Sequence, residues 1–442
     1  MKLAVTHPRF AIATGLLGAA ALLGPLALAP VAASPSAATP KTRVLLYDKA
    51  GAKGDELGYS VATSGKLIAV GVPGRRVNGH HAQGAVDVFV KRSGWRHAKL
   101  ETRLTLPNGH RNDEFGFSVA IAGSTIVAGT PLSHPGGNAS AGSVYVFSRP
   151  VGGWRNIHHP TGRLVPSDGT SSDQFGYSIA ASGSTVVVGS PGHVVGFHSS
   201  QGAVYVFTKP HDGWFNDRRQ TAELSTDENA PNSRIGYSVA ISGSMIVAGA
   251  PYQRVGSNAS QGAAYVFHRS GFSWHNGTQA AKLVASNGAA NDFFGTAVAV
   301  TGSTVAVGAP FRKVSGREHQ GVTYVFVRPS VGWFGTRNQS ATLSVHPGGN
   351  AEAFLGQAVA ASGRTIIANG GGVDAVFRRP GSGWSGVRHQ HSVITGVAGV
   401  ANLGGPSANS TVAMSSGLVV AGSPLEPIGK HTAQGAINVF VR

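Results

Sequence analysis

The chain contains no cysteine among its 442 residues, and acidic side chains are scarce. The absence of cysteine excludes disulfides, thiolate metal sites, lipid attachment at a cysteine and cysteine nucleophiles. The 36 Lys and Arg residues against 19 Asp and Glu residues give a formal net charge of +17. A balance of this sign favours acidic partners such as anionic polymers, and solubility alone is the alternative explanation.

Long apolar runs are also missing, except at the N-terminus. Two basic residues precede an uncharged apolar run at residues 10–29, and small residues around Ala33 fit a signal-peptidase site. An uncleaved membrane anchor is the alternative, because the run approaches spanning length. We expect a signal peptide at 1–33, a Ser/Ala/Pro linker at 34–41, and an exported protein that is secreted or held at the cell surface.

Glycine is abundant, and one glycine motif recurs along the chain. An apolar residue, often Phe, precedes a Gly that returns every 58–61 residues, and the seventh copy has Asn409 in place of this Gly. A period of this length is typical of a repeat architecture. The six opening glycines are Gly58, Gly116, Gly176, Gly236, Gly295 and Gly356.

Each copy has the same internal order. A short strand such as 118–121 leads through a Gly-Ser pair (Gly123-Ser124) into a Val/Ile-rich strand that ends in a motif such as Gly-Ala-Pro at 249–251. Gly at the first position of a two-residue turn suits a type II′ hairpin, because φ is positive there. A longer loop, a third strand ending in Phe, a Trp and a fourth strand follow. The Trp residues share one repeat position, which indicates packing: Trp95, Trp154, Trp214, Trp274, Trp333 and Trp384.

Four antiparallel strands in each copy predict an all-β fold, a seven-bladed β-propeller. The last copy stops after its third strand, whereas Leu46 precedes Gly58 by the same interval as Leu104 precedes Gly116. The N-terminal strand should therefore complete the last blade and close the ring, which removes two exposed strand edges. We expect one propeller domain over residues 42–442.

The Phe-Gly and Gly-Ala-Pro motifs, as in Phe115-Gly116 and at 249–251, resemble the FG-GAP repeat family. This family includes the propellers of integrin α-chains and many secreted bacterial proteins. The resemblance covers roughly residues 42–442 and implies an extracellular binding or adhesion module. It also implies that partners bind on the face that carries the loops between second and third strands.

The chain departs from the integrin type in one respect. Integrin-type repeats often hold Ca²⁺ in an Asp-rich loop between the first and second strands, but here that connection is short and has no acid, as at 242–245. Calcium needs several oxygen ligands, so the calcium function does not carry over. The His residues are scattered and lack zinc-site spacing. We expect no metal and no cofactor.

Asp recurs three residues before the opening glycine, at Asp55, Asp113, Asp173 and Asp292. Asp commonly accepts hydrogen bonds from backbone N–H groups in turns, and this is the role we predict. A ring of functional acids is the alternative.

A basic residue follows two positions after the third-strand Phe, and we expect these residues to form a ring on the face that bears the Gly-Ser turns. The ring either binds an anionic polymer or consists of solvent-exposed side chains whose aliphatic parts cover apolar neighbours. The basic ring consists of Lys91, Arg149, Lys209, Arg269, Arg328, Arg379 and Arg442.

The loops between second and third strands differ from copy to copy, as ligand-binding loops do. In the sixth copy, residues 369–372 replace both the Gly-Ala-Pro motif and the loop, and this asymmetry is a further pointer to a site. The candidate ligand-binding residues on the loops are Arg75, Arg76, His193, Tyr252, Arg254, Arg312 and Lys313.

These features favour a binding or adhesion module for a protein or an anionic polymer at the cell surface, and not an enzyme. The sequence contains no Gly-x-Ser-x-Gly element, no phosphate loop and no motif for specific nucleic-acid recognition. An extracellular hydrolase or lyase built around the propeller channel is one alternative. A passive surface scaffold is another.

Overall fold

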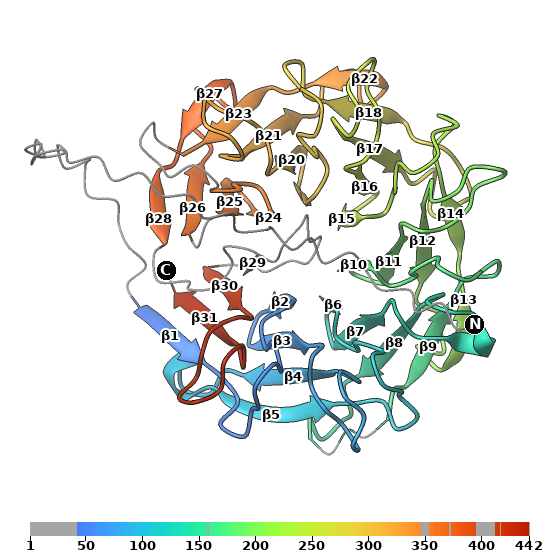
Figure 1. The fold of residues 1–442 in the computed structure, drawn as a ribbon, viewed down its shortest axis with the longest axis vertical. Coiled ribbons are helices and arrows are strands. Elements are labelled where there is room, and N and C mark those ends of the chain that lie inside the picture. The colour runs from blue at the N-terminus through green and yellow to red at the C-terminus, as the bar shows by residue number, and fades with distance from the viewer. Residues whose placement is uncertain are drawn as a thin grey trace, which may run out of the picture.

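Seven β-sheets stand around a central axis in the computed structural model (Figure 1). The structure describes residues 42–155, 157, 159–345, 353–370, 373–394, 412–415 and 417–441. Within these ranges the helical content is two short 3₁₀ turns, η1 (Trp95–His97) and η2 (Pro135–Gly137). The predicted seven-bladed propeller is therefore confirmed, whereas the predicted signal peptide and linker lie outside the described residues.

The strands of blades 1 to 6 run outward from the axis in chain order, and in blade 7 the first strand of the chain is the outermost. Blade 1 contains β2 (Val61–Ser64), β3 (Leu67–Val72), β4 (Ala85–Val90) and β5 (Lys99–Leu104), and blade 2 contains β6 (Ser118–Ala122), β7 (Thr125–Thr130), β8 (Ser143–Ser148) and β9 (Gly162–Val165). Blade 3 contains β10 (Ser178–Ser182), β11 (Thr185–Ser190), β12 (Ala203–Thr208) and β14 (Ala222–Leu224), and blade 4 contains β15 (Ser238–Ser242), β16 (Met245–Ala250), β17 (Ala263–His268) and β18 (Ala281–Val284). Blade 5 contains β19 (Val298–Thr301), β20 (Thr304–Ala309), β21 (Val322–Val327) and β23 (Ala341–Ser344), and blade 6 contains β24 (Ala358–Ser362), β25 (Thr365–Gly370), β26 (Val373–Arg378) and β28 (Ser392–Ile394). Blade 7 contains β29 (Val412–Ser415), β30 (Leu418–Ser423), β31 (Ala436–Val441) and β1 (Thr42–Leu46).

The first two strands of each blade form the tight hairpin that the Gly-Ser pair predicts. In blade 3, Ser182 pairs with Thr185, so that only Gly183 and Ser184 form the turn. Gly183 has φ +58°, a conformation that glycine adopts without strain. The second strands are buried along their whole length, as the pattern of β11 shows, because sheets of neighbouring blades cover both of their faces.

Neighbouring blades meet where a glycine on a second strand faces the opening glycine of the next blade. A Cβ atom on Gly189 would lie well under 3.0 Å from the carbonyl oxygen of Gly236. The Ser178 hydroxyl donates to the same carbonyl oxygen at 2.7 Å. This contact excludes any side chain at the second-strand position. The same pairing recurs at Gly71 with Gly116, Gly129 with Gly176, Gly249 with Gly295, Gly308 with Gly356, and Gly422 with Gly58.

The ring closes between blade 7 and blade 1 as the chain ends predict. Strand β1 pairs antiparallel with β31, with Val44 opposite Val439 (Figure 1). The side chains of Val44 and Leu46 are buried there. The backbone N–H of Leu57 also donates to the Gln434 carbonyl oxygen at 3.0 Å. The first strand of the chain thus completes the sheet that the last three strands begin.

Three further strands were not expected from the sequence. β13 (Asn216–Arg219), β22 (Gly335–Asn338) and β27 (Gly386–His389) each pair in parallel with the fourth strand of a preceding blade. Each of them follows a repeat Trp, and these Trp side chains are 3–7% exposed, which confirms their packing role. The extra strands cover outer edges that would otherwise be open to pairing.

We predict that deleting residues 42–47 lowers the melting temperature by roughly 5 °C or more. The deletion exposes the buried Val44 and Leu46 contacts, which contribute about 1.5–3 kcal/mol each, and it opens a strand edge on β31. Thermal unfolding followed by circular dichroism measures the change. The control is a chain that begins at residue 42. Equal melting temperatures for the two chains would contradict the closure.

We also predict that Gly189→Ala destabilises the fold by about 3 kcal/mol, because the added methyl group overlaps the Gly236 carbonyl oxygen. Gly152→Ala is the matched control, since a Cβ atom on Gly152 has nothing within 4 Å, and its effect should stay within about 0.5 kcal/mol. Urea unfolding of both variants compares the costs. Similar values for the two would show that the glycine contact does not hold the blades together.

Candidate functional site

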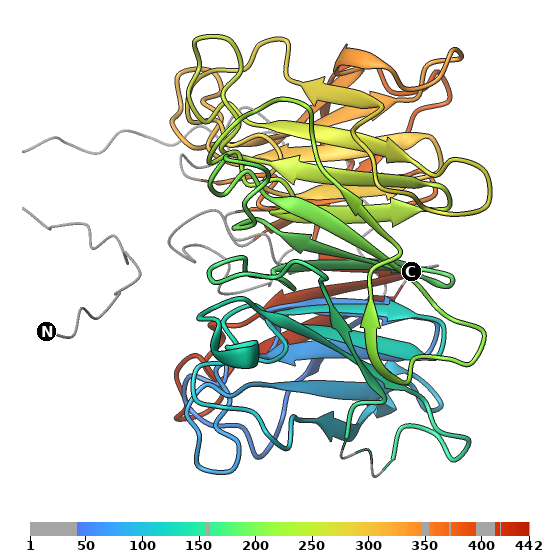
Figure 2. The ribbon, with the colours of Figure 1, turned by 90° about the vertical axis from the view of Figure 1, so that its right-hand side faces the viewer.

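The loops between second and third strands lie against the loops that enter the first strands of the next blade. The backbone N–H of Asn112 donates to the His81 carbonyl oxygen at 3.0 Å, and that of Asn232 donates to the Ser199 carbonyl oxygen at 2.8 Å. We call the surface that these loops form the loop face; Figure 2 shows the sheets edge-on, with loops projecting from both sides of the disc. Five of the loops fold back on themselves through bridges at Val77–His80, Val195–His198, Val255–Asn258, Val314–Arg317 and Ile428–His431.

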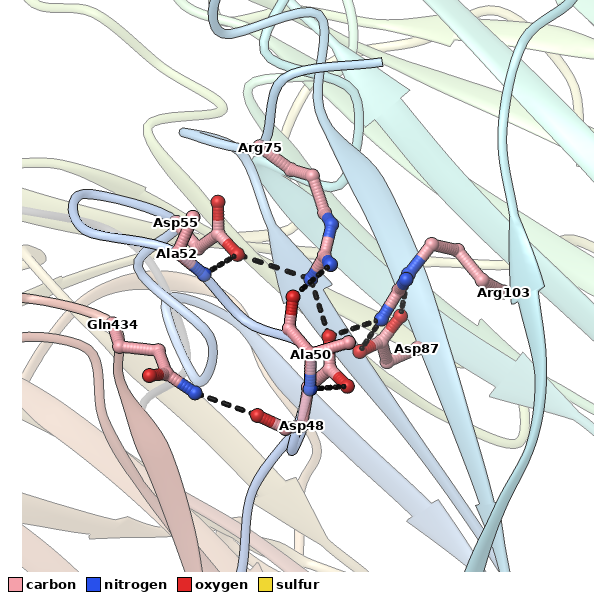
Figure 3. Close-up of polar contacts among 8 residues, drawn as sticks. All are labelled: Asp48, Ala50, Ala52, Asp55, Arg75, Asp87, Arg103 and Gln434. Atoms are coloured by element: carbon pink, nitrogen blue, oxygen red, sulfur yellow. Dashed lines mark hydrogen bonds and ion pairs between the residues drawn. The ribbon is translucent and has the colours of Figure 1, made fainter. Parts of the chain in front are cut away.

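Arg75, a predicted ligand-binding residue, points into blade 1 (Figure 3). The whole residue is 9% exposed. Its Nη1 atom lies 2.8 Å from an Asp48 oxygen and 3.1 Å from an Asp55 oxygen, and its Nη2 atom donates to the Ala50 carbonyl oxygen at 3.3 Å. The guanidinium is therefore engaged within the protein.

The same network fastens the ring closure. Arg103 lies 2.7 Å from Asp48 and 2.6 Å from the fully buried Asp87, and Gln434 of blade 7 donates to the Asp48 carbonyl oxygen at 2.6 Å (Figure 3). Burial raises the pKa of Asp87 in spite of Arg103. Burial opposes ionisation of Asp48 too, but the Ala50 N–H and the two arginines outweigh it and lower the pKa of Asp48.

The four recurring Asp residues hold their turns, as predicted. Each carboxylate accepts the backbone N–H of the residue three positions earlier, at 2.6–2.8 Å. In blade 5, Asp292 also binds Nη1 of Arg312 at 3.1 Å, so this candidate ligand residue is paired as well. The four acids are Asp55, Asp113, Asp173 and Asp292.

In blade 3, His193 replaces the arginine at this place and is 5% exposed. Its Nδ1 atom lies 3.0 Å from an Asp173 oxygen and its Nε2 atom 3.5 Å from an Asp168 oxygen. Burial by itself would lower the pKa of His193, but the hydrogen bond to Asp173 and the charges of Asp168 and Glu223 outweigh it and raise the pKa. Sequence reasoning missed Asp168 and Glu223.

Two exposed arginines and two histidines line a hollow between blades 1 and 2. Arg76 bonds the Gly79 carbonyl oxygen at 2.9 Å, and a depression of about 250 Å³ opens beside this hairpin. We call it the basic hollow; it is lined by Arg76, Gly79, His80, His81 and Arg111. The sequence pointed to the blade 1 loop, but not to Arg111, which comes from the loop that enters blade 2.

Arg254 and Lys313 lie on other exposed loops. Arg254 donates to the Ser257 carbonyl oxygen at 3.1 Å, and Lys313 pairs with Glu318. Both contacts remain within one loop. The seven candidate residues thus do not form one site: Arg75, His193 and Arg312 lie inside their blades, and Arg76, Arg254 and Lys313 lie on separate hairpins.

Tyr252, the last of the candidates, belongs to a row of aromatic rings that crosses from blade 1 to blade 6. Successive ring centroids are 5.0–6.1 Å apart. The Arg234 guanidinium lies 4.8 Å from the Tyr252 ring centroid, and burial raises the pKa of Tyr177 to about 12. The sequence did not reveal this aromatic arc because its members occupy three different repeat positions: Tyr59, Phe117, Tyr177, Tyr237, Tyr252, Phe293, Phe311 and Phe354.

The aromatic arc borders the central channel, because Tyr59 directly precedes Ser60 in the channel wall. The channel cavity holds about 30 Å³, and the described residues that line it are Ser, Val, Ile and Ala. The Ser60 hydroxyl donates to the Gly116 carbonyl oxygen at 2.8 Å. The part of the channel wall that the structure describes therefore presents no charged side chain to the channel.

The basic ring lies beside the Gly-Ser turns, on the face opposite the loop face. For example, the backbone N–H of Lys209 donates to the Ser184 carbonyl oxygen at 2.7 Å, and that of Arg269 donates to the Ser244 carbonyl oxygen at 2.9 Å. The six described members stand on six different blades, and Arg442 lies outside the described residues. That these residues bind an anionic polymer stays a prediction.

The sixth blade is shortened as expected: Gly370 pairs with Val373, so two residues connect β25 to β26. Two polar side chains, Asn369 and Asp374, are fully buried beside this short connection. Asn369 donates to Asp374 at 2.7 Å, while Asn369 Oδ1 and Asp374 Oδ2 have no hydrogen-bond partner among the described residues. Burial raises the pKa of Asp374 from 3.8 to about 6. Asn409 of the seventh copy lies outside the described residues.

Four stretches of the chain match the FG-GAP repeat family: residues 99–147, 160–207, 219–267 and 278–326. Each stretch begins at or near the fourth strand of one blade and ends at the third strand of the next, which is the offset that closes the ring. The chain is an FG-GAP repeat β-propeller. No curated protein matches it. The described residues include no helix that is both long and apolar enough to cross a membrane.

We predict that Asp374→Asn stabilises the protein at pH 8 by about 3 kcal/mol and changes its stability little at pH 4. Since the pKa of Asp374 in the folded chain, about 6, exceeds its ordinary value of 3.8, its contribution to stability is present below pH 3.8 and is lost as pH rises through 6. In the variant an NH₂ donor replaces the unsatisfied Asp374 Oδ2 atom, beside Asn369, whose Oδ1 atom also lacks a partner. Urea unfolding of both proteins from pH 4 to 8 tests this, and parallel pH profiles would refute it.

Proposed function

We propose that this propeller is an exported binding module, secreted or held at the cell surface, that binds an anionic polymer on its loop face. The basic hollow carries the proposal. Two arginines and two histidines line a depression of about 250 Å³, and no acidic residue is among the described residues that line it. This volume lies just below that of pockets for drug-sized ligands, so it suits one acidic group of a longer chain.

The surroundings of the basic hollow favour a polymer over a small molecule. The whole chain has a formal net charge of +17, and Arg254 adds an exposed cation on another hairpin of the loop face. A chain of repeated acidic groups can contact several of these separate positions at once, which adds affinity without a deep pocket. The loops themselves are held by backbone bonds to their neighbours, so little ordering accompanies binding.

We propose no enzymatic activity for this fold. The described residues that line the central channel are uncharged Ser, Val, Ile and Ala. The recurring acids are engaged with backbone N–H groups. These observations support a binding module over the hydrolase or lyase alternative.

We predict that the mature protein binds polygalacturonate and dextran sulfate but not neutral dextran, and that binding weakens as salt rises because exposed charges are screened. The double variant Arg76→Ser/Arg111→Ser should bind about ten-fold more weakly, a loss of about 1.4 kcal/mol. Surface plasmon resonance on the immobilised polymers measures both effects.

The matched control is Lys209→Ser/Arg328→Ser, which removes two charges from the basic ring on the opposite face. This control should bind like the unchanged protein. An equal loss in both double variants would mean that net charge, and not the loop face, governs binding. A loss only in the control would assign binding to the basic ring, and equal binding to neutral dextran would reject an electrostatic partner altogether.

A further inference from the structure

Blade 3 carries a cluster of one histidine and three carboxylates that the anionic-polymer function does not use. Asp168 lies on the loop between β9 and β10, His193 follows β11, and Glu223 lies in β14. One potential ligand atom from each of these three side chains lies within 4.8 Å of the other two. We propose that Asp168, His193 and Glu223 bind a single divalent transition-metal ion such as Zn²⁺.

The histidine is oriented as a metal ligand requires. Its Nδ1 atom lies 3.0 Å from Asp173, whose carboxylate is itself fixed by the Thr170 backbone N–H at 2.7 Å and the Thr170 hydroxyl at 2.8 Å. A carboxylate on one ring nitrogen fixes the ring and leaves the other nitrogen for the metal. That second nitrogen, Nε2, faces Asp168 at 3.5 Å on a side chain that is only 7% exposed.

The carboxylates can reach an ion without backbone movement. The Asp168 side chain is 38% exposed, and Tyr205 donates to its other oxygen at 2.9 Å. Ligand atoms around Zn²⁺ at about 2.0–2.2 Å from the metal lie roughly 3.3 Å apart, so small rotations of two acidic side chains complete the site. Because Asp168 is open to solvent, the ion has an entry path and keeps a free coordination position for water.

The other blades show that this cluster lacks the Lys or Arg found at the corresponding place elsewhere. Glu223 pairs with Tyr205 across the strands, and the corresponding residues in blades 1, 2 and 4 are Arg103, Arg163 and Lys282. In blade 1, arginines therefore lie between the acids. In the described part of blade 3, no Lys or Arg pairs with Asp168, Asp173 or Glu223. Blade 3 has the acid Glu223 where blades 1, 2 and 4 have a basic residue. A divalent cation bound beside Glu223 would supply the positive charge that the basic residue supplies there.

The ligand set selects the class of ion. One imidazole nitrogen with two carboxylates suits Zn²⁺ and similar transition metals. Calcium prefers six to eight oxygen ligands and should bind far more weakly here. The site is unrelated to a calcium loop between first and second strands, because none of its ligands lies on the Gly-Ser hairpin.

The test is Zn²⁺ titration of the metal-stripped mature protein by isothermal calorimetry, with a weak competing chelator that suppresses binding at scattered surface histidines. We expect one tight Zn²⁺ per chain. Glu223→Gln should weaken it at least ten-fold, and Glu223→Lys, which copies Lys282 of blade 4, should abolish it. Asp217→Asn, which removes an exposed carboxylate of β13, is the matched control and should leave the affinity unchanged.

Co²⁺ provides an independent readout, since its visible absorption spectrum reports the geometry of the bound site. The same variants should lose the Co²⁺ spectrum that the unchanged protein shows. Circular dichroism checks that each variant is folded, and Asp168→Asn, at the more exposed position, replaces the Glu223 variants if they unfold. The proposal is overturned if the unchanged protein binds no tight Zn²⁺, or if the Glu223 or Asp168 variants bind as many ions with the same affinity.

Discussion

At six of the seven junctions between neighbouring blades the contact is one that only glycine permits, and Asn369 takes the place of this glycine in blade 6. The carbonyl oxygen of an opening glycine, such as Gly236, occupies the space where a side chain on Gly189 would stand, and a serine hydroxyl holds it there. The contact fixes how closely neighbouring blades approach each other. Because Gly422 meets Gly58 in the same way, the ring closes with the geometry of its interior contacts, and the first strand completes the last sheet.

The contacts between blades also hold the loops of the loop face in place. With the blades locked together, the loop that leaves one blade lies within backbone hydrogen-bond distance of the loop that enters the next, as the bond from Asn112 to His81 shows. Side chains on these loops then point either into the blade or out to solvent. Arg75 and Arg312, each two residues after the Pro that follows a second strand, point into the blade and pair with acids, whereas Arg76 points outward.

The blades also show how one frame carries different chemistry. At the same two positions blade 1 has Arg75 and Arg103, and blade 3 has His193 and Glu223. Blade 1 thereby neutralises its acids with fixed guanidinium groups and uses them to fasten the ring closure. Blade 3 has Asp168, Asp173 and Glu223 around its histidine and no arginine paired with them in its described part, and so offers ligands where blade 1 offers a structural ion-pair network.

The sequence by itself determined the repeat, the four-stranded blade, the Gly-Ser hairpin and the ring closure. These features depend on residues such as Gly183, which forms a local turn, and Val44, which occupies a fixed place in the repeat. A local turn and a repeat spacing are both visible in the sequence itself. The tertiary structure decided which side chains meet. His193 reaches Asp168 and Glu223 from separate strands and loops, and the hollow at Arg76 needs Arg111 from the next blade. Such groupings depend on how neighbouring blades pack, and sequence spacing carries no record of that packing.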